Sequence, residues 1–472
     1  MQFVINPKSI SESDVVVIGG GTAGVFAAIS AAKNGVKTIL VEKNSTLGGT
    51  VTTGGVNFPG LFFAWGRQII DGPCWAAIKR TVELGGAKLP EFQYKPERHW
   101  HEQILLDNFV YRSVLLQMCV ENGVEIITNT MISYIKEDAD GVDLLITSKE
   151  GIHQITTKAL IDATGDANAV SMAGYDTVKS NIQQPATPQN HISGYTFENI
   201  DLEQIHTNFS KANFPPQITE DKIKNSLRNH KFDIHIPCRD AETSEGRTKL
   251  EYDAIELVLN LYTFCRGIRG LENLKVDYYA EETGVRETVR IVGETTLTAE
   301  DYINGKHFGD SVCYAFYPID LHIMSGIKQK FFEDNKIGEI PYGALIPKGA
   351  KRILCAGRCI STDTDANSAV RVQAPCMATG QVAGCAAAIS AKNNIAVKEI
   401  PFHMLCRSLE EIDAIVPKDN FLSKHCVLYL TVAEVFVLGL GAKIFTIAEP
   451  VILYGSVASE VYGIIYLVTT SF

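Results

Sequence analysis

The chain has 472 residues, of which 46% are hydrophobic and 21% are charged, as is normal for a globular enzyme. Its formal net charge of -11 argues against nucleic acid as a main partner, because a phosphate backbone needs a basic protein face. The length indicates two intertwined domains rather than one. The segment before Asp14 carries neither an apolar run nor a small-residue cleavage site, so we expect no secretory signal and a cytoplasmic protein.

Residues 14–43 predict a strand, a glycine turn, a helix over 22–34 and a second strand. DVVVI is a continuous apolar run, and the glycines after it have G-x-G-x-x-G spacing. In this motif the first glycine permits the tight turn, the second allows close approach of a diphosphate, and the third lets helix and strand pack. The diphosphate would lie at the positive end of the helix. The residues expected around it are Gly19, Gly21, Thr22, Ala23 and Gly24. The alternative is a glycine turn in a unit that binds nothing.

The second strand of this unit ends on Glu42, whose carboxylate is placed to accept hydrogen bonds from both hydroxyls of an adenosine ribose. Lys43 follows, and Gly48 and Gly49 come shortly afterwards. This run resembles FAD proteins with the glutathione-reductase type of flavin domain rather than nicotinamide dehydrogenases. We therefore count Glu42, Lys43 and Gly49 among the candidate cofactor-binding residues.

Residues 47–75 are rich in glycine and poor in charge, which suits a wall that a flat aromatic ligand approaches closely. Gly54, Gly55 and Asn57 would line the flavin ring or its substrate. Arg67 could pair with an anionic group, or equally form a surface ion pair.

Past a helix expected over 104–122, residues 124–137 alternate as one strand, and further antiparallel strand-like runs follow. The last of these runs ends at Asp162. The turn of Thr164, Gly165 and Asp166 would then return to the dinucleotide and place a second backbone edge against the diphosphate.

From about 174 to 277 the sequence is more polar and loop-rich, and we interpret it as an inserted substrate domain. Arg286 and Arg290 follow; if helical, they share a face and could bind an oxyanion, although an ion-pair pattern with Glu287 and Glu294 explains them equally well. Asp320 and His322 alternate along an expected strand and share a face. His322 is the leading acid-base candidate because the ordinary pKa of histidine lies near neutrality, and the alternative is a buried histidine whose hydrogen bonds are satisfied within the protein.

The strand RILCAG leads into a loop rich in Ser, Thr and Asp, and then into a helix of small residues expected over 368–390. The positive end of that helix would stabilise charge on reduced flavin. Asp363 or Asp365 could bind a ribityl hydroxyl, and Arg358 could hold an anionic substrate or the flavin. The candidate cofactor-binding residues here are Gly357, Arg358, Asp363, Asp365 and Ser368.

Together these segments resemble the FAD-dependent oxidoreductase family that includes flavoproteins similar to the flavin-binding part of heterodisulfide reductase. The resemblance rests on the motifs above together with GVRETVRIVGE and IPYGALIP, and covers roughly residues 12–418. It implies an α/β fold with a Rossmann-like FAD-binding domain of the glutathione-reductase type, an inserted α+β substrate domain and non-covalent FAD. Thr364 stands where relatives often carry a histidine, which puts an acid-base role for that loop in doubt.

Two main functions follow from the resemblance. The first is hydride transfer between flavin N5 and a small organic substrate that could be anionic, with His322, Arg286 and Arg290 as the catalytic candidates. The second is an electron-transfer subunit of a heterodisulfide-reductase-like complex, with a redox protein as partner. A third, a flavoprotein whose FAD is structural or serves RNA modification, fits the acidic balance poorly.

The 11 cysteines form no C-x2-C-x2-C run, so we expect no 4Fe–4S cluster. Cys355 and Cys359 would lie too far apart for an unstrained disulfide if the chain between them is extended.

We expect the FAD-binding domain over 12–173 and 336–418, with the substrate domain over 174–335 inserted between its two parts. The apolar tail over 419–472 has charges that divide it into runs shorter than the ~20 residues of a membrane span. An extra packed segment, membrane association and a non-native terminus remain alternatives for that tail.

Overall fold

The computed structural model describes residues 7–92, 102–324 and 326–418, so the predicted apolar tail lies outside the described residues. Residues Met1–Pro417 form one compact unit. Within its described part, none of the helices combines the length and the apolar character needed to cross a membrane.

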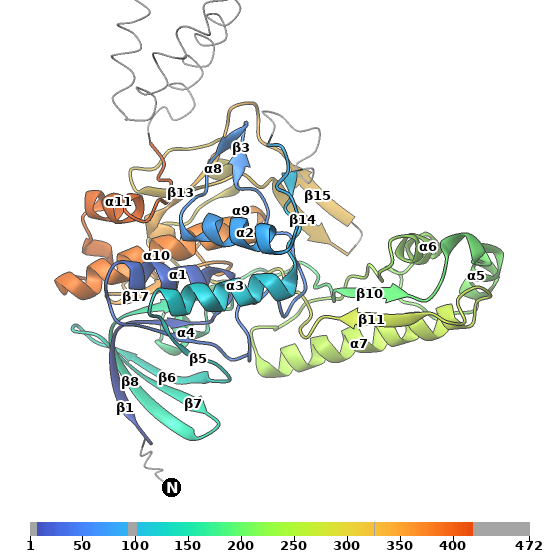
Figure 1. The fold of residues 1–472 in the computed structure, drawn as a ribbon, viewed down its shortest axis with the longest axis horizontal. Helices are drawn as coiled ribbons and strands as arrows, with labels where there is room; N and C mark the ends of the chain where they lie inside the picture. The colour runs from blue at the N-terminus through green and yellow to red at the C-terminus, as the bar shows by residue number, and fades with distance from the viewer. Residues whose placement is uncertain (1–6, 93–101, 325, 419–472) are drawn as a thin grey trace, which may run out of the picture. The chain divides into compact units, whose positions relative to one another are not determined.

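A seven-stranded sheet organises this unit (Figure 1). Its order is β5-β2-β1-β8-β7-β6, and β17 pairs with the end of β8. The pairs among β5, β2, β1, β8 and β17 are parallel, whereas β8, β7 and β6 pair antiparallel. The strands are β1 (Ile10–Ile18), β2 (Thr38–Val41), β5 (Glu125–Ile127), β6 (Met131–Glu137), β7 (Val142–Ser148), β8 (Gly151–Asp162) and β17 (Ile353–Cys355). The 12-residue β8 therefore belongs to both the Rossmann-like sheet and the antiparallel meander.

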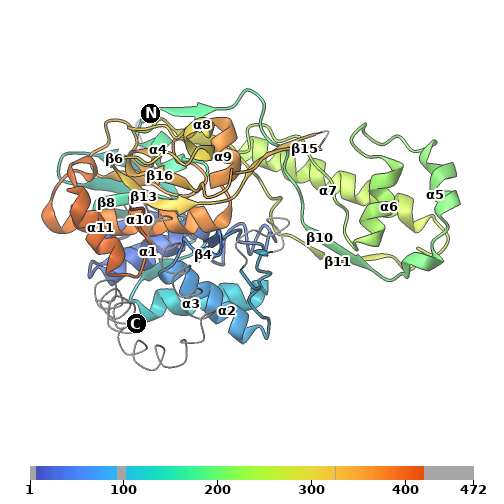
Figure 2. The same cartoon turned by 90° about the horizontal axis from the view of Figure 1, so that it is seen from above.

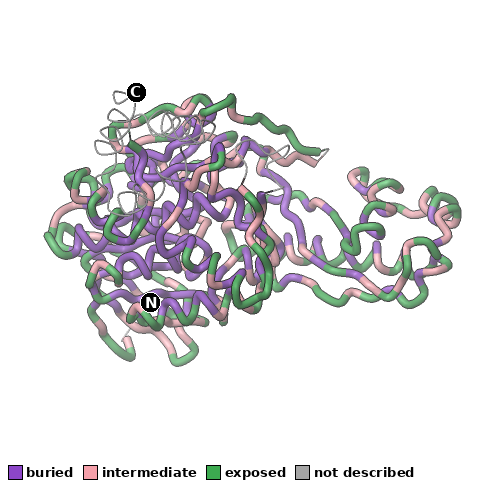
Figure 3. The backbone as a smooth tube through the Cα atoms, turned by 45° about the horizontal axis from the view of Figure 1, so that its top comes forward, coloured by how far each residue is buried: buried purple, intermediate pink, exposed green. Residues whose placement is uncertain are grey.

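Two helices of small residues pack closely beside the parallel strands. α1 (Thr22–Lys33) and α10 (Gln373–Asn393) lie side by side in both Figure 1 and Figure 2. A Cβ added to Gly380 would lie 2.2 Å from the Ala23 carbonyl oxygen, and one added to Gly384 would lie 2.2 Å from that of Ala27. The two backbones approach this closely because glycine faces the contact. Figure 3 shows that buried residues gather in the interior of the unit.

A second core belongs to the region expected to bind substrate. Buried side chains from Ala186 to Val285 cluster there, among them Ile205, Leu227 and Leu261. The elements of this lobe are β10 (Asn190–Ser193), α5 (Leu202–Phe209), α6 (Glu220–Arg228), α7 (Ser244–Arg266) and β11 (Lys275–Tyr279). β10 and β11 form an antiparallel ribbon that runs along α7 in Figures 1 and 2.

The remaining strands and α-helices complete the unit. They are β3 (Phe63–Ala64), β4 (Arg67–Gln68), α2 (Pro73–Leu84), α3 (Asn108–Glu121), α4 (Asn168–Met172), β9 (Thr177–Lys179), β12 (Val289–Ile291), α8 (Ala299–Ile303), β13 (Ser311–Ala315), β14 (Ile319–Ile323), β15 (Gly326–Lys330), β16 (Gly338–Pro341), α9 (Thr364–Val370) and α11 (Phe402–Glu410). β13 pairs with β16, and β12 with β9. The pairing of β9 with β12 joins the segments that enter and leave the lobe.

Two local predictions were wrong. The single strand expected over 124–137 is two strands, β5 and β6, because the chain turns at Asn129, which has a φ of +52°. The helix expected over 368–390 is two helices, α9 and α10, separated at Val372, whose backbone is extended. The condition under which Arg286 and Arg290 would share a helical face is not met, because Arg290 lies in β12 and Arg286 precedes that strand.

Candidate flavin and substrate site

The glycines of the turn between β1 and α1 differ in whether the packing of the protein itself excludes a side chain at their position. Gly19 has a φ of +99°, and a Cβ on it would lie 2.6 Å from the Ala163 carbonyl oxygen. A Cβ on Gly24 would lie 1.7 Å from the Gly19 carbonyl oxygen. Gly21 has an ordinary φ of -77°, and its Cβ would meet only the Gly49 Cα, at 3.8 Å. Packing of the protein thus requires Gly19 and Gly24, whereas it leaves room for a side chain at Gly21.

This difference fits a bound diphosphate. No side chain among the described residues caps the start of α1, which begins at Thr22 and continues through Ala23 and Gly24. The first amides of a helix have no partner inside it and carry its partial positive charge. The open space over Gly21 lies at that helix end, where a diphosphate could approach the backbone.

Glu42 lies at the end of β2, as predicted, and is buried. Its carboxylate accepts hydrogen bonds from the backbone N–H groups of Gly20 (2.6 Å) and Asn44 (2.7 Å). Burial raises the pKa of Glu42. The carboxylate therefore braces the glycine turn, and contact with a ribose remains a prediction. Lys43 forms an ion pair with Glu282 at the surface.

The turn after β8 lies against the glycine turn, since a Cβ on Gly19 would lie 2.6 Å from the Ala163 carbonyl oxygen, and its contact with a diphosphate remains a prediction. Asp162 is buried and accepts hydrogen bonds from the backbone N–H and the hydroxyl of Thr164, at 3.0 and 2.7 Å. Arg358 donates from Nε to the Gly165 carbonyl at 2.9 Å and from Nη2 to Asp166 at 2.5 Å. Its Nη1 donates to the Val285 carbonyl at 2.5 Å. All three guanidinium nitrogens of Arg358 thus have protein partners, which ties this turn to the loop after β17.

The loop after β17 holds the remaining cofactor candidates. Gly357 has a φ of +87°, and a Cβ on it would lie 2.9 Å from the Ala23 Cβ, so this glycine borders α1. The Asp363 carboxylate accepts hydrogen bonds from the backbone N–H groups of Ala366 and Ala299, both at 2.7 Å. It caps α9, an observation that favours a structural role over ribityl binding.

Asp365 and Ser368 lie within α9. Asp365 is exposed, and the Ser368 hydroxyl donates to the Asp365 carbonyl at 2.7 Å. The same hydroxyl accepts from the Asp320 backbone N–H at 3.0 Å. Because the next helix begins only at Gln373, the positive helix end expected near Ser368 is displaced to Gln373.

The Arg290 side chain is buried, and its guanidinium nitrogens contact other groups of the protein. Its Nε donates to the Thr362 carbonyl at 3.0 Å, its Nη atoms lie 3.2 Å from the Ser180 hydroxyl, and Glu287 is 3.9 Å away. These contacts favour the ion-pair interpretation of Arg290 over a catalytic one.

Asp320 and His322 share a face of β14, as predicted. The His322 Nε2 lies 3.0 Å from the Asp320 Oδ2, and the other Asp320 oxygen accepts from the Gln329 Nε2 at 2.8 Å. The His322 Nδ1 is buried and has no hydrogen-bond partner among the described residues. Burial lowers the pKa of His322, and the positive charges of Arg286 and Arg371 act in the same direction. The His235 ring lies edge-on to His322, with 5.6 Å between centroids.

Sequence reasoning missed Arg371 and Gln184, which complete this cluster. The Gln184 side-chain oxygen accepts from the Arg371 Nη2 at 3.3 Å and from the His322 backbone N–H at 3.1 Å. Arg286 approaches from a third segment and donates to the Pro185 carbonyl at 2.5 Å and the Thr187 hydroxyl at 2.9 Å. No local pattern distinguishes Arg371 in SAVRVQ, since only the fold brings it to His322.

The glycine-rich loop predicted as a wall contacts the start of α10. The Gln373 Nε2 donates to the Val56 carbonyl at 2.6 Å, and the Ala374 N–H donates to the Pro59 carbonyl at 2.6 Å. A Cβ on Gly60 would lie 3.5 Å from Val372 and 3.8 Å from Tyr317. The start of α10 thus joins the loop to the residues around His322.

Cys355 and Cys359 are free thiols with their sulfurs 3.1 Å apart. The chain turns at Gly357 instead of continuing extended, so the condition under which the two residues would lie too far apart is not met. Among the described residues, no group of three or more His, Cys, Asp and Glu side chains could hold a metal ion.

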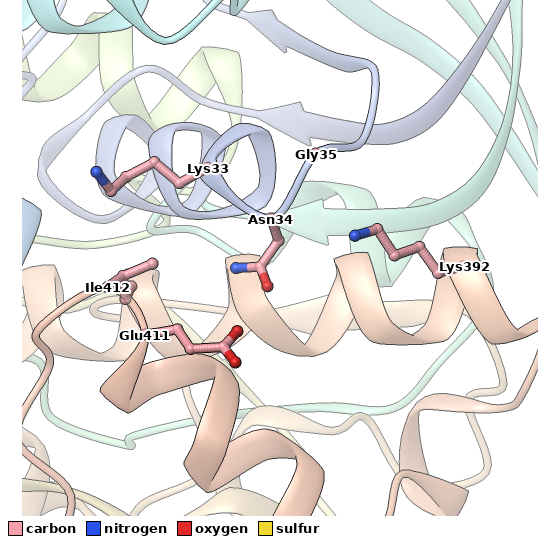
Figure 4. Close-up of a pocket in the computed structure, with 6 residues that line it drawn as sticks. All are labelled: Lys33, Asn34, Gly35, Lys392, Glu411 and Ile412. Carbon is pink, nitrogen blue, oxygen red and sulfur yellow. The ribbon is translucent and has the colours of Figure 1, made fainter.

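Figure 4 shows a surface hollow elsewhere in the unit. It lies at the carboxyl-terminal end of α1, whereas the glycine turn lies at the other end. Its lining residues are Lys33, Asn34, Gly35, Lys392, Glu411 and Ile412. None of them belongs to the predicted site, so the hollow adds nothing to it.

Known proteins are similar to parts of this sequence. Thiamine thiazole synthase from Methanococcus vannielii is 31% identical over 170 residues, which cover 34% of this chain and 59% of that protein. Mitochondrial dihydrolipoyl dehydrogenase from Caenorhabditis elegans is 58% identical over 45 residues, which cover 10% of this chain and 9% of that protein. The chain thus spans about three fifths of the length of the thiazole synthase.

One solved structure, a geranylgeranyl bacteriochlorophyll reductase-like protein from Thermoplasma acidophilum, aligns with a TM-score of 0.41 at 12% identity and covers 86% of this chain and 84% of that one. The family described as FAD dependent oxidoreductase matches residues 14–409. The match includes the glycine turn, Glu42, the turn after β8, His322 and the start of α10. The chain therefore belongs to the FAD-dependent oxidoreductase family, and FAD is its cofactor.

Proposed function

We propose that the protein transfers a hydride between flavin N5 and a small anionic organic substrate, using a flavin domain of the glutathione-reductase type. The observation that carries the proposal is the unpartnered, buried Nδ1 of His322 beside the guanidinium groups of Arg286 and Arg371. Buried polar atoms usually have partners, so such an atom points to a missing ligand.

In this proposal His322 moves the substrate proton. Asp320 accepts a hydrogen bond from the His322 Nε2–H, which leaves Nδ1 as the ring atom that can accept a proton. Because its pKa is lowered, the imidazole is neutral at pH 7 and can act as a base. Asp320 also stabilises the imidazolium that forms. Arg286 holds the negative charge of the substrate.

The remaining residues bind and orient. FAD supplies the hydride acceptor or donor at N5. The amides at the start of α1 and the space over Gly21 would hold its diphosphate. The loop that includes Val56, Pro59 and Gly60 would border the ring system, and the positive end of α10 at Gln373 would favour negative charge there.

The test is anaerobic reduction of the flavin by a panel of small acids, alcohols and sugars, followed at the flavin absorbance band. Once a reducing compound is found, His322→Gln should retain FAD but slow the reduction about 10²- to 10⁴-fold. His206→Gln is the control, because its side chain is 74% exposed on α5 and far along the chain from the cluster. Equal rates for wild type and His322→Gln would refute the role of His322.

The second candidate is an electron-transfer subunit. Tyr252, Ile255 and Leu259 on α7 are 64%, 54% and 57% exposed and lie on one helical face, which favours contact with a protein partner. This function predicts that no small compound reduces the flavin but a reduced electron-carrier protein does. The two functions therefore give opposite results in the same assay.

A further inference from the structure

We infer that Arg371 and Arg286 together bind a carboxylate group, so that the substrate is an organic carboxylate. This inference rests on the proposed function and names its substrate class. Arg371 is the C-cap residue of α9, two residues before the start of α10, and Arg286 lies in the segment between the lobe and β12. The fold brings the two guanidinium groups together from segments 85 residues apart in the chain.

The two guanidinium groups are close enough to affect each other. Burial lowers the pKa of Arg286 to about 10, and the charge of Arg371 contributes to that shift. Burial also lowers the pKa of Arg371. Two adjacent cations removed from water are unfavourable unless an anion compensates them.

The protein does not supply that anion at contact distance. In the described part of the chain, no carboxylate lies within 4.0 Å of a guanidinium nitrogen of Arg286 or Arg371. Three carboxylates of this region have other partners: Asp320 bonds His322 and Gln329, Glu287 bonds Gln184 and pairs with Arg290, and Asp166 pairs with Arg358. The charge of Asp233 also acts on Arg286, but from beyond ion-pair distance. An anionic ligand would complete the cluster.

The free donors fit a carboxylate. The Arg371 Nε is buried and has no hydrogen-bond partner among the described residues, while its Nη2 makes one long bond of 3.3 Å to Gln184. A guanidinium group binds a carboxylate through two parallel N–H donors, and Nε with a neighbouring Nη provides such a pair. Arg286, whose Nη1 is engaged, has further N–H groups for the same anion.

The His322 ring, with its orphaned Nδ1, belongs to the same cluster. One Gln184 oxygen accepts from the His322 backbone N–H and from Arg371, and the charges of both arginine residues act on the His322 imidazole. A ligand held by the two arginine residues would therefore present a neighbouring group to His322. The carboxylate takes no part in the chemistry and serves to position the substrate.

The experiment titrates the FAD-loaded enzyme with oxalate, which carries carboxylates and no oxidisable C–H bond, at constant ionic strength. Binding is followed by the shift of the flavin absorbance band, and oxamide, the uncharged analogue, serves as the ligand control. We expect saturable binding of oxalate but not oxamide, weakened at least 10-fold by Arg371→Gln. Arg371→Lys, which keeps the charge but lacks Nε, should bind with intermediate affinity. Arg269→Gln, whose side chain is 80% exposed, should bind within 2-fold of wild type.

Equal oxalate affinity in wild type, Arg371→Gln and Arg371→Lys would overturn the inference, as would equal binding of oxamide. If Arg371→Gln loses FAD, the ratio of the oxalate affinities of wild type and Arg371→Lys tests the inference instead. A different result refutes the proposed function, namely that the substrate reduces the flavin of His322→Gln at the wild-type rate. If oxalate affinity does not depend on Arg371 but flavin reduction still requires His322, the proposed function stands and only this inference is refuted.

Discussion

Replacing Gly21 by alanine should abolish FAD binding while leaving the fold intact. The added Cβ would meet only the Gly49 Cα at 3.8 Å, and the φ of -77° is allowed for alanine. Alanine is a poorer N-cap residue than glycine by up to ~1 kcal/mol. The reduced freedom of the unfolded chain offsets about 0.4–1 kcal/mol of that. The free energy of unfolding without FAD should therefore change by less than about 1 kcal/mol.

FAD should lose affinity because the methyl group occupies the space where the diphosphate approaches the backbone. A ligand at 100 times its Kd stabilises a protein by about 2.7 kcal/mol, so wild type should gain that amount at such an FAD concentration and Gly21→Ala should not. The assay is urea unfolding with and without added FAD, together with the flavin content after desalting.

Gly24→Ala provides the matched comparison. Its Cβ would lie 1.7 Å from the Gly19 carbonyl oxygen, so the turn must move. We expect a loss of about 1–3 kcal/mol of stability even without FAD. Wild-type FAD content in Gly21→Ala would refute this account of the glycine turn. So would a Gly21→Ala protein that, without FAD, is as unstable as Gly24→Ala.

Three further predictions concern other residues. In stopped-flow measurements from pH 5 to 8, the rate of substrate oxidation should rise as His322 loses its proton and should level off above the His322 pKa. Burial lowers that pKa below the ordinary value for histidine. A rate that falls over this pH range would contradict the role of His322 as a base. In urea unfolding, Gly384→Ala should lower the free energy of unfolding by about 1–3 kcal/mol, because its Cβ would lie 2.2 Å from the Ala27 carbonyl oxygen. The control Gly309→Ala, whose Cβ would meet no atom within 4 Å, should change the free energy of unfolding little. Cys355 and Cys359 should resist a thiol reagent in the native protein and react after unfolding, because both are completely buried; rapid native reaction would contradict that packing.

The sequence predicted the elements whose causes are local. The unit from β1 to β2 follows from an apolar run, three glycines of fixed spacing and Glu42, and each has the predicted place in the structure. The pairing of Asp320 with His322 was also predictable, because alternate residues of a strand share a face.

Other features depend on tertiary contacts that the local pattern does not contain. Residues 124–137 alternate throughout, yet β5 joins the parallel sheet and β6 the meander, on either side of Asn129. Arg371 resembles any helical arginine in sequence, and its proposed role depends on Gln184 and Arg286, which come from distant segments. The candidate site was therefore predictable on its diphosphate side and only partly on its substrate side.

The central claim is that this FAD-dependent enzyme oxidises or reduces a small organic substrate at its bound flavin. The most direct measurement is the absorbance spectrum of the purified protein during anaerobic addition of small organic acids, alcohols and sugars. We predict a bound flavin whose absorbance band bleaches with at least one carboxylate, and bleaches far more slowly in His322→Gln. A bound flavin that no small compound bleaches, but that a reduced electron-carrier protein does, would contradict the claim.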